Sequence, residues 1–135
     1  RCEIFPVKRM EERYAQGVRQ RISAIGPREY TRMAPAIRHM TSMFAGVEAK
    51  IRLLIVLSDG KPEDYDDYKG DYAIEDTRHA LLEAKAKGIH PFCITIDRQA
   101  HEYMNHMYGE VNYIFIDKVN QLPARMPEIY RALTS

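Results

Sequence analysis

Residues 51–57 are apolar except for Arg52, and they lead directly into Ser58, Asp59 and Gly60. A strand without polar alternation is typical of a parallel sheet that is covered on both faces. Sheets of that kind bind ligands beyond the carboxyl ends of their strands. The sequence therefore predicts that Ser58 and Asp59 lie at a functional edge, where Gly60 allows the chain to turn.

Strand patterns alternate with helix patterns along most of the chain, which predicts right-handed crossovers and a mostly parallel sheet. The expected fold class is α/β, a three-layer α-β-α arrangement with a doubly wound, Rossmann-like sheet, formed by one domain over residues 1–135. Pro6 restricts the first strand pattern to a sheet edge. The predicted strands cover residues 2–8, 51–57, 89–97 and 112–117, and the predicted helices cover residues 11–25, 34–44, 74–87, 101–108 and 122–133.

Composition excludes several classes of protein. The 135 residues carry 20 basic and 19 acidic side chains, a formal charge of +1, which gives no electrostatic reason to expect nucleic acid as a partner. No apolar run approaches the length of a membrane helix, and no signal peptide opens the chain, so we expect a cytoplasmic protein without membrane insertion. Cys2 and Cys93 are too few for a disulfide framework. The start at Arg1 leads us to expect a piece of a longer protein.

Four segments carry a resemblance to a known family: YTRMAPAIRHMTSMF, LLIVLSDGKP, YKGDYAIEDTRHALLEAKAKGI and PFCITIDRQA. They resemble the von Willebrand factor A (vWA) domain of the NorD/CbbO-type nitric oxide reductase activation proteins, and the resemblance covers nearly the whole chain. It implies a metal-ion-dependent adhesion site with Mg²⁺ or Mn²⁺. In this sequence Thr31 matches the family's threonine ligand and Asp59 its aspartate, with Ser58 nearby. The family leaves one coordination position open for a carboxylate of a partner.

The family's Asp-x-Ser-x-Ser motif does not occur in this chain, so Thr31 and Asp59 are the ligands that remain. The resemblance thus implies an N-terminally truncated domain that holds the third to sixth strands of the order 3-2-1-4-5-6. The strand at 51–57 would then present an open apolar edge. We expect either residues 2–8 or a second copy of the chain to pair with that edge. We also expect Thr31 and Asp59 alone to bind Mg²⁺ weakly.

The segment PEDYDDYKGDY follows Asp59 and is rich in acids and tyrosines, but it lacks the ligand spacing of a calcium loop. Tyrosine is enriched at protein interfaces. We therefore interpret Tyr65, Asp66, Asp67 and Tyr68 as candidate partner-binding residues.

Two other functions remain open. Asp59 could act as the nucleophile of a phosphoryl-transfer or phospho-receiver domain, although only Lys61 is near it in sequence. Ser58 could act as the nucleophile of a hydrolase, although the sequence around it lacks the Gly-x-Ser-x-Gly motif. A zinc site on His101 and His106 is disfavoured because the two histidines are five residues apart, not four.

The preferred interpretation is not an enzyme. It is the interaction module of an accessory protein that works with a MoxR-type AAA+ ATPase to activate a metalloenzyme, with nitric oxide reductase as the favoured client.

Overall fold

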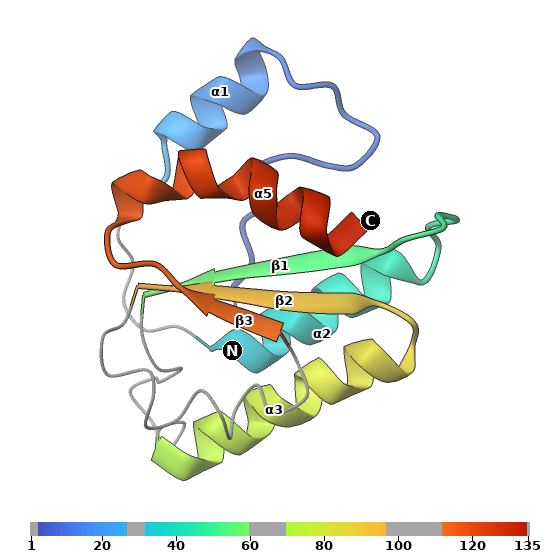
Figure 1. Cartoon of the computed structure of the whole chain (residues 1–135). Coiled ribbons are helices and arrows are strands. Elements are labelled where there is room, and N and C mark those ends of the chain that lie inside the picture. Colours follow the sequence, from blue (N-terminus) through green and yellow to red (C-terminus); the bar gives the residue numbers. More distant parts are fainter. Residues whose placement is uncertain (1–2, 27–31, 60–69, 97–111, 135) are drawn as a thin grey trace.

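The computed structural model describes residues 3–26, 32–59, 70–96 and 112–134. Within these ranges the elements follow one another in the predicted order of strand and helix from β1 onward (Figure 1). They are α1 (Gln16–Ser23), α2 (Met33–Phe44), β1 (Leu53–Ser58), α3 (Gly70–Ala86), β2 (His90–Thr95), β3 (Asn112–Phe115), the short 3-10 helix η2 (Val119–Gln121) and α5 (Leu122–Thr134).

The strands form one sheet in the order β1-β2-β3, and both pairings are parallel. Leu53 is paired with His90, and Phe92 with Asn112, so all three carboxyl ends meet at one edge. The prediction of a mixed α/β fold with parallel strands is confirmed. The six-strand order of the complete fold is larger than this sheet and stays a prediction.

The sheet is covered on both faces (Figure 1). Alternate residues of a strand point to opposite faces, so Leu54 and Leu53 belong to different apolar clusters. The α2/α3 layer contains Met33, Ala34, Ile37, Phe44, Leu54, Ala73, Ile74, Ala80, Leu81, Ala84, Ile89 and Cys93. The α5 layer contains Phe92, Ile94, Ile116 and Ile129, with Leu53, Ile55, Ile114, Leu122, Met126 and Leu133 packed against them.

Local sequence explains where α2 and α3 begin and end. Pro35 lies in the first turn of α2, where a missing backbone N–H costs little. After α3 the chain turns at Gly88, whose φ of 77° is in the left-handed region that favours glycine. The N–H of Gly88 donates to the carbonyl oxygen of Lys85 at 3.0 Å, and that of Ile89 donates to Ala84 at 3.1 Å. This pair of bonds is a Schellman motif, which stops the helix and starts β2 in the right direction.

An ion cluster joins α2 to α3. Arg38 lies 2.8 Å from the carboxylate of Asp76 and 3.1 Å from that of Glu83, which is about two turns further along α3. These partly exposed pairs add little to stability, but they fix how the two helices face each other.

The predicted strand over residues 2–8 is wrong for residues 3–8, which form no strand in the structure. Ile4 and Phe5 are consecutive exposed apolar residues, so the segment does not have one buried face, and Pro6 removes a backbone donor. The predicted helix over residues 11–25 is shorter than expected and covers Gln16–Ser23. Glu12 instead lies before α1, where Arg21 binds its carboxylate.

We found no helix, among those the structure describes, that is both long and apolar enough to cross a membrane.

Candidate functional site

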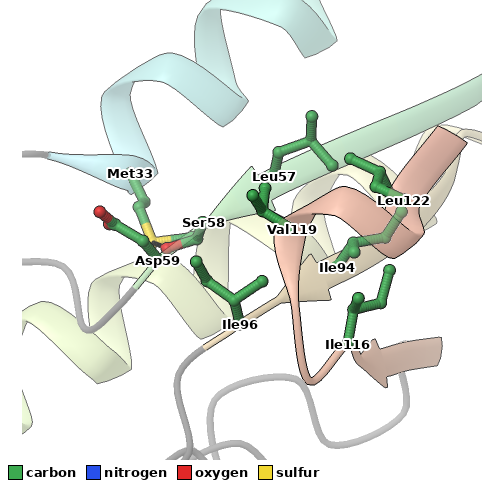
Figure 2. A pocket seen from close by; sticks show the side chains of 9 residues that line it. All are labelled: Met33, Leu57, Ser58, Asp59, Ile94, Ile96, Ile116, Val119 and Leu122. Atoms are coloured by element: carbon green, nitrogen blue, oxygen red, sulfur yellow. Dashed lines mark hydrogen bonds between the residues drawn. The ribbon is translucent and has the colours of Figure 1, made fainter.

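A hollow of about 310 Å³ opens at the carboxyl ends of β1 and β2 (Figure 2). It lies on the α5 side of the sheet, where η2 and the start of α5 pass over the ends of the strands. Most of its lining is aliphatic, and its polar groups come from Ser58, the last residue of β1, and from Asp59, which follows it. The lining residues are Met33, Leu57, Ser58, Asp59, Ile94, Ile96, Ile116, Val119 and Leu122.

The polar rim is built where β1 meets the first turn of α2. Ser58 is the last residue of β1, and its hydroxyl donates a weak hydrogen bond to the sulfur of Met33 at 3.9 Å. Asp59 follows, with an exposed side chain. The contact between Ser58 and Met33 therefore brings the start of α2 beside the end of β1.

The amino end of α2 adds a favourable environment for negative charge at this rim. No side-chain cap is formed at Arg32, which precedes the helix, and the first turn contains no acidic residue. The unpaired N–H groups at the start of a helix carry a partial positive charge that favours an anion nearby. Asp59 is the acidic residue among those that line the hollow, which Met33, the first residue of α2, also lines.

Several predicted site residues lie outside the described part of the chain. These are Thr31, Tyr65, Asp66, Asp67, Tyr68, Lys61 of the phosphoryl-transfer alternative, and the two histidines of the zinc alternative, His101 and His106. Asp117 is exposed two residues after β3, and Tyr72 at the start of α3 has 64% of its surface exposed. The structure thus tests the placement of Ser58 and Asp59, and it puts both at the predicted edge.

The apolar lining of the hollow was missed by the sequence interpretation. Val119 is 64% exposed and Ile96 is 36% exposed, which is unusual for aliphatic residues beside a polar rim. A signal was available, because Val119 is the single aliphatic residue in the otherwise polar segment 117–121.

Within the described ranges, no cluster of three or more His, Cys, Asp or Glu side chains is arranged to hold a metal ion. Ser58 and Asp59 are hard oxygen donors of the kind that Mg²⁺ prefers, but Mg²⁺ needs about six ligands in near-octahedral geometry. Among the described residues these two therefore supply fewer oxygen donors than Mg²⁺ needs.

Comparison with known proteins points to one group of relatives. Protein NorD of Brucella abortus is 42% identical over 130 residues, which cover 96% of this chain and 20% of that protein. Protein NorD of Stutzerimonas stutzeri is 43% identical over 115 residues, 85% of this chain and 19% of that protein. An uncharacterized protein of Pseudomonas aeruginosa is 45% identical over 127 residues, 94% of this chain and 21% of that protein.

These identities support membership of the NorD family. The chain spans about a fifth of the length of the curated relatives it matches. No protein-family model and no solved structure matches it.

Proposed function

We propose that this chain, a homologue of the NorD proteins over nearly all of its length, is a non-enzymatic docking module of a protein that helps to activate nitric oxide reductase. The observation that carries the proposal is the exposed Asp59 at the rim of an apolar hollow, at the edge where open parallel sheets bind ligands. Its partners are a MoxR-type AAA+ ATPase and the reductase itself.

In this proposal Asp59 takes part in a site for Mg²⁺ or Mn²⁺ together with Thr31, which precedes Met33 by two residues in the sequence. Ser58 lies next to Asp59 and its hydroxyl is held near the start of α2 by Met33. The ion would supply a positive charge that attracts a carboxylate of the partner. Further ligands come from water, from the partner, or from residues beyond the described ranges.

The acidic, tyrosine-rich segment after Asp59 provides a second contact with the partner. Tyr65 and Tyr68 are its proposed anchors, and Asp66 and Asp67 contribute negative charge. Support comes from their position in the sequence, because β1, which precedes the segment, ends at the edge where the hollow opens. The exposed ring of Tyr72 at the other end of the segment is consistent with an aromatic contact surface.

The lining of the hollow gives no support to a reaction centre. Beyond Ser58 and Asp59 its walls are aliphatic side chains and Met33, so no described lysine, histidine or second carboxylate lines the hollow beside Asp59. Phosphoryl transfer and serine hydrolysis both require such groups.

The test is a pull-down of the cognate ATPase by the full-length protein, with Mg²⁺ and with EDTA. Asp59→Ala should weaken binding to the level seen with EDTA, and melting temperature should change little because the side chain is exposed. Glu48→Ala is the matched control, since Glu48 is exposed and precedes the opposite end of β1. If neither EDTA nor Asp59→Ala reduces the amount of ATPase bound, the metal mechanism is ruled out.

A further inference from the structure

Contacts at both ends of α2 tie this helix to the chain of β1. Just before β1 begins, Nη1 of Arg52 donates to the carbonyl oxygen of Phe44, the last residue of α2, at 3.4 Å. At the end of β1, the hydroxyl of Ser58 donates to the sulfur of Met33, the first residue of α2, at 3.9 Å. The helix therefore runs antiparallel to the strand (Figure 1).

The helix and the strand have similar lengths, so both contacts can form together. The rise from Met33 to Phe44 is about 17 Å in helical geometry, and the strand extends about 20 Å from Arg52 to Ser58. Apolar packing is not directional, so it holds the helix against the sheet without fixing its position along the strand. The contacts at the two ends supply that position.

Met33 has the burial and the reach to fix the start of α2. Leu54 belongs to the α2/α3 layer, and Ser58, four residues later in the same strand, faces the same side of the sheet. Met33 belongs to that layer as well, and only 4% of its surface is exposed. It also lines the hollow, where Figure 2 shows its sulfur beside Ser58 and Asp59. An unbranched thioether fills irregular gaps, so this side chain occupies the space between the start of α2 and the end of β1.

We infer that Met33 is a positioning residue for the docking site, an inference that rests on the function proposed above. Asp59 follows the end of β1, and Thr31 precedes Met33 by two residues in the sequence. The two proposed ligands therefore adjoin the two elements that Met33 joins. Shortening the side chain of Met33 removes the contact between these elements and leaves both ligands in the chain.

The test is the Mg²⁺ dependence of ATPase capture by the full-length protein. Met33→Ala should raise the Mg²⁺ concentration that gives half-maximal capture by about tenfold, a loss typical of residues that support metal ligands without touching the ion. At saturating Mg²⁺ the amount of ATPase captured should return to the wild-type level, because Asp59 is unchanged.

Ile37→Ala is the matched control. Ile37 lies one turn further along α2, belongs to the same α2/α3 layer and is 3% exposed, but it is not among the residues that line the hollow. Truncation of either buried side chain should lower the melting temperature. Only Met33→Ala should change the Mg²⁺ requirement, which a purely structural role of Met33 would not do.

Hydrogen exchange followed by mass spectrometry gives a second measurement that needs neither Mg²⁺ nor the ATPase. In the full-length protein, Met33→Ala should speed amide exchange in peptides that cover residues 55–59, because the end of β1 loses its contact with α2. Ile37→Ala should leave that exchange at the wild-type rate. If EDTA does not reduce capture by the wild type, the docking proposal fails, and hydrogen exchange still decides whether Met33 positions the end of β1.

Three results would overturn the inference. The first is exchange at residues 55–59 that Met33→Ala leaves unchanged. The second is an unchanged Mg²⁺ requirement in Met33→Ala when capture by the wild type is sensitive to EDTA. The third is an equal effect of Ile37→Ala on both measurements. Should Met33→Ala fail to fold, Met33→Val and Ile37→Val make the same comparison with smaller truncations.

Discussion

The Nη2 atom of Arg52 donates a hydrogen bond to the carbonyl oxygen of Lys87 at 2.6 Å, at the point where α3 ends. Its Nη1 atom also approaches the carbonyl oxygen of Phe44, the last residue of α2, at 3.4 Å. One guanidinium group thus binds the carboxyl ends of two helices. Cations are favourable there because the last carbonyl groups of a helix carry partial negative charge.

Arg52→Met should lower the free energy of unfolding by about 1 kcal/mol. Hydrogen bonds from a charged donor stabilise a protein more than neutral ones do, but solvent reduces that contribution here because the Arg52 side chain is partly exposed. Urea denaturation measures the loss. Lys87→Met is the control, because it removes one positive charge at the same helix end without removing a bond to the Lys87 carbonyl. Equal losses in the two variants would show that charge alone matters.

Gly88→Ala should lower the free energy of unfolding by about 1 to 2 kcal/mol, because Gly88 has a φ of 77° and an added Cβ would meet Arg52 Nη2 at 2.9 Å. Gly46→Ala, at a glycine with open space around it, should be close to neutral. Combining Gly88→Ala with Arg52→Met should cost less than the sum of the two. Strict additivity would mean that the two residues do not interact.

Glu12 should make a pH-dependent contribution to stability. Arg21 donates a hydrogen bond to its carboxylate, and the backbone N–H of Arg9 donates another, so the pKa of Glu12 lies below its usual value in the folded chain. A lowered folded pKa gives stability that is present above the unfolded pKa and is lost as the pH falls through the folded pKa.

The stability difference between the wild type and Glu12→Gln should accordingly shrink from neutral pH to about pH 3. High salt should also reduce it, because the Glu12–Arg21 pair is partly exposed to solvent. Denaturation midpoints at several pH values test this, with Glu11→Gln as the neighbouring exposed control. A difference that is constant over the whole range would contradict the assignment to Glu12.

Mg²⁺ should bind this chain weakly on its own, since Ser58 and Asp59 are the oxygen donors that the described rim supplies. Low-millimolar Mg²⁺ should leave the melting temperature within about 2 °C, because a ligand stabilises a protein only when its concentration exceeds the dissociation constant. Isothermal titration provides the direct measurement. Micromolar affinity that disappears in Asp59→Ala would show that the chain alone forms a complete site.

Tyr65→Ala and Tyr68→Ala should weaken binding to the ATPase and leave the melting temperature within about 2 °C, as expected for rings that face solvent or a partner. Tyr113→Ala is the contrasting variant. Its ring packs against the α2/α3 layer, so its truncation should cost a few kcal/mol and lower the melting temperature by several degrees. A large loss at Tyr65 or Tyr68 would assign those rings to the core.

Much of the sheet and its helices could be predicted because their signals are local. The apolar run before Ser58 identifies β1, and the helical spacing of Ile74, Thr77, Leu81 and Ala84 identifies the buried face of α3, all four being buried. The predicted helix over residues 74–87 ends within one residue of α3, because Gly88 follows it with a positive φ.

What could not be predicted depends on residues that are distant in sequence. From the sequence, Arg52 is only a charged residue in an apolar strand pattern. Its role could not be predicted, because the carbonyl groups that it binds are at the ends of two helices, at Phe44 and Lys87. The hollow likewise combines the first residue of α2 with residues from β1, β2 and the segment around η2. The position of Asp59 was predictable from β1, but the aliphatic surface beside it was not.

The strand β2 belongs to both apolar layers, since Cys93 lies in the α2/α3 layer while Phe92 and Ile94 lie in the α5 layer. If α5 detaches, β2 keeps its contacts with α3 and its hydrogen bonds to β1. Its amide protons should therefore exchange with solvent only when the whole chain unfolds, whereas those of α5 should exchange through a smaller opening. The molecule is thus expected to lose its two layers in separate steps, with β2 as the last ordered segment.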